Sequence, residues 1–216
     1  MNRCFLLLIP IIAVVANGQT FRAGQSAPSA NPGKHWAASQ ASENGRKYDE
    51  AIGEVRSYQQ EGGDAFLANT RTGWLKYLKG DYAGAALAYG AANKLQASAL
   101  NPLLGLLNVA QAQQDLKGTE RAAEAVLHVA PSNYTAQMAL AGAYFAQKDF
   151  NKAGSQYRRV LIFYPDDVDA MSSAAWSDFY RGSRRDAADG FRKILSVSPE
   201  YLGASTGLEL SQKPVK

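Results

Sequence analysis

The residues that could perform acid–base, nucleophilic or metal chemistry are few and far apart in this chain of 216 residues. There is one cysteine, Cys4, and the two histidines, His35 and His128, lie in opposite halves of the sequence. A structural zinc site takes about four ligands, and a Cys–His catalytic pair needs both groups within reach, so neither is expected. Acidic pairs such as Asp166 and Asp167 occur at expected turns or helix starts, where carboxylates stabilise the helix dipole. We therefore expect no enzymatic activity, no cofactor and no metal site.

Composition and charge exclude several further classes of protein. With 46% hydrophobic and 19% charged residues, the chain is typical of a folded protein, of a length that suits one large domain or a small pair. The 23 Lys and Arg residues are spread along the sequence among 19 Asp and Glu residues, which disfavours a nucleic-acid partner. A binding or scaffolding protein is what remains.

The N-terminus has the profile of a signal peptide. Arg3 precedes an uncharged apolar run over residues 5–16. As a helix this run would be about 18 Å long, too short for the roughly 30 Å hydrocarbon core of a membrane, so no stable membrane span is expected. We predict a signal peptide over residues 1–18, cleaved before Gln19, with cleavage before Asn17 as the second choice. The alternative is a hydrophobic N-terminal helix that stays buried in the fold.

Cleavage would leave a chain without cysteine, which suits an oxidising compartment such as the bacterial periplasm. Residues 19–33 are rich in Ser, Ala, Gly, Pro and Gln and predict a flexible linker. A folded domain is expected over residues 34–212, in a periplasmic or secreted protein.

A period of 34 residues runs through that domain. Pro131, Pro165 and Pro199 are 34 residues apart, and each follows an apolar run. Three more positions recur in the same period: a small one at Ala51, Ala85, Thr119, Ala153 and Ala187; a second small one at Ser39, Gly73, Leu107, Ala141 and Ala175, broken only at Leu107; and a larger one at Val55, Tyr89, Ala123, Tyr157 and Phe191. Two helices approach closely only where side chains are small, so each period predicts a helical hairpin, and no strand is expected.

The hairpin turns and ends carry their own signals. In the stretches 80–82 and 148–150, Asp81 and Asp149 can cap the second helix of a hairpin. A proline ends that helix because it lacks an amide donor and forces the preceding residue out of the helical region.

These residues resemble the tetratricopeptide repeat family, whose internal turn is matched by the stretches 47–52, 80–85 and 148–153 and whose repeat end is matched by the prolines. The resemblance implies an all-α, right-handed superhelical solenoid of about five helix-turn-helix units, with a partial capping helix over 202–212. The units would span 32–65, 66–99, 100–133, 134–167 and 168–201. In the third unit Thr119 occupies the position after the turn that is alanine in the other units, which predicts a second helix that starts late. Gly62 and Gly63 end the first unit and predict a flexible junction.

In this family the first helix of each hairpin lines a concave groove. The resemblance therefore implies a partner-binding groove formed by Trp74, Tyr77, Asn108, Gln111, Phe145, Trp176 and Phe179. Aromatic rings bind with little loss of conformational entropy, and side-chain amides can bond to an extended backbone or to sugar hydroxyls. The alternative is that Trp74 and Trp176 are core residues packed between successive units.

The expected function is that of an exported, non-catalytic adaptor that binds a protein or peptide segment and helps to assemble an envelope, secretion or surface complex. Arg71 is the only cation near the inward phases of the second and third units, so the basic clamp of cytosolic chaperone-binding members of the family is absent. A polysaccharide in an export system is the alternative ligand, and self-association is left open.

The export hypothesis predicts the N-terminus of the mature protein. Edman or mass-spectrometric sequencing of the protein from the periplasm or medium should find Gln19 or Asn17 as its first residue. A cytosolic product that retains Met1 would contradict it.

Overall fold

The computed structural model describes residues 15–16, 19–20 and 31–213, and almost all of the described chain is helical. The described residues form eleven helices: α1 (Pro32–Asn44), α2 (Tyr48–Gln60), α3 (Ala65–Lys79), α4 (Tyr82–Leu95), α5 (Leu100–Ala112), α6 (Leu116–Val129), α7 (Tyr134–Ala146), α8 (Phe150–Phe163), α9 (Val168–Tyr180), α10 (Arg184–Val197) and α11 (Leu202–Gln212). Among these residues no helix is both long enough and apolar enough to cross a membrane.

Two short strands precede the helices. Strand β1 (Val15–Ala16) pairs antiparallel with β2 (Gln19–Thr20). The expectation that the chain has no strand is therefore wrong for these residues. The rest of the predicted signal peptide and most of the predicted linker lie outside the described residues, and α1 begins at Pro32, inside the range predicted for the linker.

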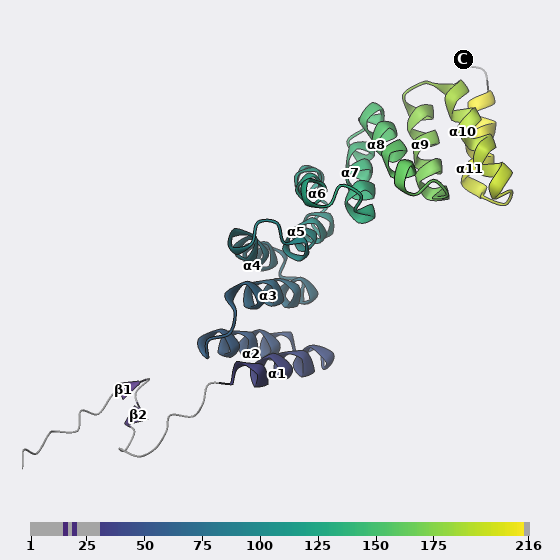
Figure 1. Ribbon diagram of the computed structural model, residues 1–216. Coiled ribbons are helices and arrows are strands. Elements are labelled where there is room, and N and C mark those ends of the chain that lie inside the picture. Colours follow the sequence, from purple (N-terminus) through teal and green to yellow (C-terminus); the bar gives the residue numbers. More distant parts are fainter. Residues whose placement is uncertain (1–14, 17–18, 21–30, 214–216) are drawn as a thin grey trace, which may run out of the picture.

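The helices form a solenoid in which each helix packs against the next one in the chain (Figure 1). Along the row the helix axes turn, from α1–α3 at one end to α7–α11 at the other. The predicted all-α repeat solenoid is confirmed. The helix expected over 202–212 is α11, which packs against α10 and also contacts α9.

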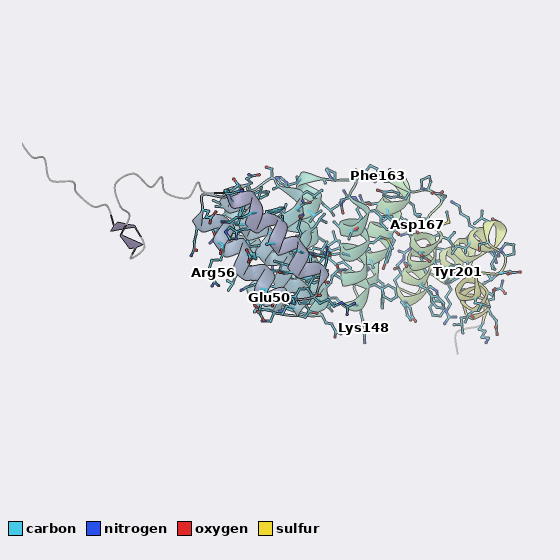
Figure 2. All side chains as sticks on the ribbon, turned by 90° about the horizontal axis from the view of Figure 1, so that it is seen from below. Glu50, Arg56, Lys148, Phe163, Asp167 and Tyr201 are labelled. Atoms are coloured by element: carbon cyan, nitrogen blue, oxygen red, sulfur yellow. The ribbon has the colours of Figure 1, made fainter. Side chains whose placement is uncertain are left out.

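The turns within and between units lie at opposite edges of the solenoid. In Figure 2, Lys148 in the turn of the fourth unit lies at one edge, whereas Phe163 at the end of α8 lies at the other. The side chain of Asp81 accepts a hydrogen bond from the Gly84 amide at 2.9 Å, which caps α4 as predicted.

The prediction that the second helix of the third unit starts late is wrong. Helix α6 begins at Leu116, in the same phase as the start of α4 and α8. The reason is that Asp115 accepts a hydrogen bond from the Gly118 amide at 2.8 Å and so caps α6 in the same way as Asp81 caps α4. Thr119 is buried at the position that alanine occupies in the other units, so its side chain fits there.

Each turn within a unit contains one residue in the left-handed region, and these residues are also 34 apart: Arg46, Gly80, Gln114, Lys148 and Gly182. Glycine adopts this conformation freely, whereas a residue with a side chain costs about 1–2 kcal/mol there. Because three of these five residues are not glycine, this recurring turn position was not identified from the sequence. The junction after the first unit, predicted to be flexible, is a hydrogen-bonded turn in which the Gly63 amide donates to the Tyr58 carbonyl at 2.9 Å.

The core is built from small and large residues that meet between helices. The ring of Tyr89 lies against Gly73 of α3 and Gly105 of α5, and a Cβ atom at either glycine would overlap it. In the fifth unit, buried Phe191 packs in one cluster with Ala175. Large residues of the second helices thus fill the space that small residues of the first helices leave.

The third unit inverts this arrangement. Leu107 is large where the other units carry Ser, Gly or Ala, and Ala123 is small where they carry Val, Tyr or Phe. Both are fully buried in one cluster with Val126. The apparent break in the sequence pattern is therefore a compensating exchange of volume across the hairpin.

The packing of Tyr89 predicts opposite effects of one substitution at two helical glycines. Gly105→Ala should lower the free energy of unfolding, because the overlap with the buried ring costs about 1–3 kcal/mol. Gly90→Ala in α4 meets no atom within 4 Å and should raise it by about 0.5–1 kcal/mol. Urea unfolding followed by circular dichroism measures both. Equal effects of the two substitutions would contradict this account of the core.

Candidate functional site

The seven predicted groove residues do not form one continuous site. Trp74 and Asn108 line one pocket, Gln111 lines a second, and Phe145, Trp176 and Phe179 belong to an aromatic cluster of the last two units. The ring of Tyr77 stacks on Trp74, with ring centroids 6.1 Å apart, and also contacts Tyr82. Tyr77 packs against the buried cluster that contains Tyr89.

The first pocket, called here the Trp74 pocket, lies between α3 and α5 and has a volume of about 250 Å³. It is lined by Thr70, Trp74, Tyr89, Asn101, Leu104, Gly105 and Asn108. Trp74 is 39% exposed, so its ring is available to a ligand. The buried ring of Tyr89, held by the two glycines described above, belongs to the same pocket. The packing of Tyr89 in the core therefore also determines the shape of the Trp74 pocket.

Glu43 at the end of α1 fixes the orientation of Trp74. Its carboxylate accepts a hydrogen bond from the Trp74 indole Nε1 at 2.6 Å and pairs with the Arg71 guanidinium at 2.6 Å. The guanidinium carbon of Arg71 also lies 5.8 Å from the ring centroid of Trp36. The pairing balances the charges of Glu43 and Arg71 beside the tryptophan.

The second pocket, called here the Gly142 pocket, has a volume of about 610 Å³ and lies between the α5–α6 turn and α7. It is lined by Gln111, Gln114, Leu116, Thr119, Tyr134, Thr135, Met138, Ala139, Gly142 and Ala143. The sequence analysis placed Gln111 in the groove but did not find this pocket, because the space depends on how α7 packs against the preceding unit.

Neither pocket is lined by a Lys, Arg, Asp or Glu residue. Their tyrosines also stay uncharged near neutral pH. Burial raises the pKa of Tyr89 to about 12, and a hydrogen bond to Asp167 raises the pKa of Tyr134 to about 12. Both pockets are therefore suited to a neutral ligand.

The aromatic cluster of the last two units joins the groove to the core. Trp176 packs edge-on against the fully buried Phe191 at 5.1 Å and against Phe179 at 5.5 Å. Phe145 contacts Tyr180 at 5.7 Å. Tyr180 is 53% exposed and was missed by the sequence analysis, although it directly follows Phe179. Trp176 is more deeply engaged in packing than Trp74.

Several titratable groups of the described chain are engaged in structural ion pairs. Asp178, only 4% exposed, pairs with Arg158 at 2.6 Å and with Arg181 at 3.0 Å. His35 bridges two carboxylates of the first unit, with Nδ1 2.6 Å from Glu54 and Nε2 3.1 Å from Glu61. Among the described residues no three His, Cys, Asp or Glu side chains are placed to hold a metal ion.

Comparison with known proteins relates the chain to a family and to several solved structures. A model of the tetratricopeptide repeat family matches residues 110–175, from α5 to α9. The fold is similar to that of YrrB, with a TM-score of 0.68 and 14% identity, over 83% of this chain and 93% of YrrB. It is also similar to MamA from Desulfovibrio magneticus RS-1, with a TM-score of 0.65 and 17% identity, over 85% of this chain and 97% of MamA.

A tetratricopeptide repeat protein from Parabacteroides merdae ATCC 43184 is similar as well, with a TM-score of 0.70 and 13% identity, over 83% of this chain and 72% of that protein. At these identities the likeness is one of fold. No curated protein sequence matches the chain.

The His35 bridge predicts a pH dependence of stability. Hydrogen bonds to Glu54 and then to Glu61 raise the pKa of His35, and the bond to His35 lowers the pKa of Glu61. The histidine's contribution is fully present below its unfolded pKa of about 6.5 and is lost as pH rises through the raised folded value. The contribution of Glu61 is present above its unfolded pKa of about 4.3 and is lost as pH falls through the lowered folded value.

The difference in melting temperature between the native protein and His35→Gln should therefore be largest at about pH 5 to 6 and shrink above it. A difference that stays constant from pH 5 to 9 would contradict the bridge.

Proposed function

Because the chain is a tetratricopeptide repeat protein, we propose that it acts as a non-catalytic adaptor that binds a protein segment along the first helices of its repeats. The observation that carries the proposal is the pair of neutral pockets on successive repeats, with Trp74 and Asn108 in one and Gln111 in the other. An extended peptide crosses several repeats and offers a backbone to the amides and apolar side chains to the pockets.

The likeness to YrrB supports this proposal. YrrB is described as a TPR protein with an unusual peptide-binding site, and it shares the fold over most of both chains. We further propose that the protein is exported and acts in the periplasm or outside the cell, in an envelope, secretion or surface complex. That part of the proposal rests on the apolar run over residues 5–16 and on the absence of cysteine after residue 4.

One observation favours a polysaccharide as the second candidate ligand. Tyr180 is half exposed and stacks on Phe150, with ring centroids 5.1 Å apart, so its outer face is a platform on which a sugar ring could lie. This candidate would use the last two repeats, whereas the peptide would use the second to fourth.

The adaptor proposal predicts that Trp74→Ala separates binding from stability. Crosslinking and pull-down from the envelope fraction of the native host should capture a protein with the native chain. Trp74→Ala should lose that capture, by about 2 kcal/mol or more of binding free energy, while it stays folded. Leu87→Ala is the matched control, because Leu87 is 78% exposed on α4 and lines neither pocket.

Trp176→Ala should behave differently, because this ring packs on buried Phe191. We expect a loss of about 3 kcal/mol in the free energy of unfolding. Unchanged capture by a folded Trp74→Ala variant would contradict the adaptor site, and co-purifying polysaccharide in place of a protein would favour the second candidate.

A further inference from the structure

One position of the repeat differs sharply between units. Trp74, Asn108, Gly142 and Trp176 occupy the same place in the 34-residue period, on the first helices of the second to fifth units. Two units therefore place a tryptophan there, whereas the fourth unit places no side chain at all. The Gly142 pocket opens at this position.

The absence of a side chain at Gly142 is not required by the fold. The glycine lies inside α7 with a negative φ, and a Cβ atom there would meet only the Tyr157 hydroxyl, at 3.9 Å. By contrast, a Cβ atom at Gly105 would overlap a buried ring. Glycine inside a helix is less stable than alanine, so the absence of a side chain at Gly142 lowers stability for a reason that packing does not explain.

The pocket walls show what could fill that space. Leu116, Met138 and Ala143 supply apolar surface, while Gln111 and Thr135 supply hydrogen-bonding groups. A volume of about 610 Å³ is ample for a large ring. A charged group would be desolvated with no opposite charge among the lining residues, which is unfavourable.

We propose that the Gly142 pocket receives an aromatic side chain from an uncharged, extended segment of the partner protein, in the place where Trp74 and Trp176 stand in their own repeats. This inference rests on the proposed adaptor function and names the partner's chemistry. The partner's ring completes the series of aromatic residues along the repeats. The Gln111 amide and the Thr135 hydroxyl can bond to the segment's main chain on either side of the ring.

The two methionines of the folded domain allow a direct test. Met138 lines the Gly142 pocket, whereas Met171 lines a separate cavity beside α10. In protein labelled with ¹³C at the methionine methyl groups, N-acetyl-tryptophanamide should shift the Met138 signal in a saturable way and leave the Met171 signal unchanged. N-acetyl-lysinamide should shift neither signal.

Filling the pocket should abolish this response. Gly142→Trp places an indole of the chain itself in the space and should weaken binding of N-acetyl-tryptophanamide at least ten-fold. The matched control is Gly53→Trp on α2, where a Cβ atom meets nothing within 4 Å. It should bind like the native protein, and circular dichroism checks that both variants are folded.

Any one of the following results would overturn the inference: no saturable shift of Met138, an equal shift with the lysine probe, or normal binding by folded Gly142→Trp. A shift caused by maltotriose and not by the tryptophan probe would also overturn it, in favour of a sugar ligand. Pull-down separates the two proposals. If capture depends on Trp74 but not on Gly142, the proposed role of the Gly142 pocket is overturned and the adaptor function stands. If Met138 shows a saturable shift but no protein is captured, the ligand of the Gly142 pocket is supported and the adaptor function is contradicted.

Discussion

Close approach of two helices at small residues is the constraint on which the structure depends. The ring of Tyr89 fits between α3 and α5 only because Gly73 and Gly105 have no Cβ atom. This contact fixes how the second unit meets the third, and the same ring belongs to the Trp74 pocket. The spacing of the solenoid and the shape of its groove therefore have one physical origin, and a change in core volume would reach the candidate site.

Within this regular frame the groove position is free to vary. The series Trp, Asn, Gly and Trp along the first helices of the second to fifth units changes the surface of the groove, and only in the fifth unit is the ring shown to pack on a buried residue of its own hairpin, Phe191. Glu43 and Arg71 neutralise each other beside Trp74, and no charged residue lines either groove pocket. The Trp74 pocket and the Gly142 pocket therefore discriminate against charged ligands by desolvation.

The sequence was sufficient to predict features that depend on local spacing. The hairpins, the Asp81 cap and the helix ends before the prolines follow from short-range backbone chemistry that repeats every 34 residues. Features that depend on contacts between helices could not be predicted. The Leu107 and Ala123 exchange looked like a break in the pattern, and whether Trp176 lines the groove or belongs to the core was left as two alternatives. The Gly142 pocket is formed by helices of two units, and Gly142 is the only feature of the sequence that points to it.

Site-specific photocrosslinking tests the central claim, that the partner lies along the first helices, most directly. A benzophenone amino acid at exposed Gln111, in the groove, and one at exposed Leu87, on α4, would be compared in cells that produce the partner. The account predicts a specific crosslinked product from position 111 and none from position 87. A product from position 87 alone would place the partner on the second helices and contradict the account.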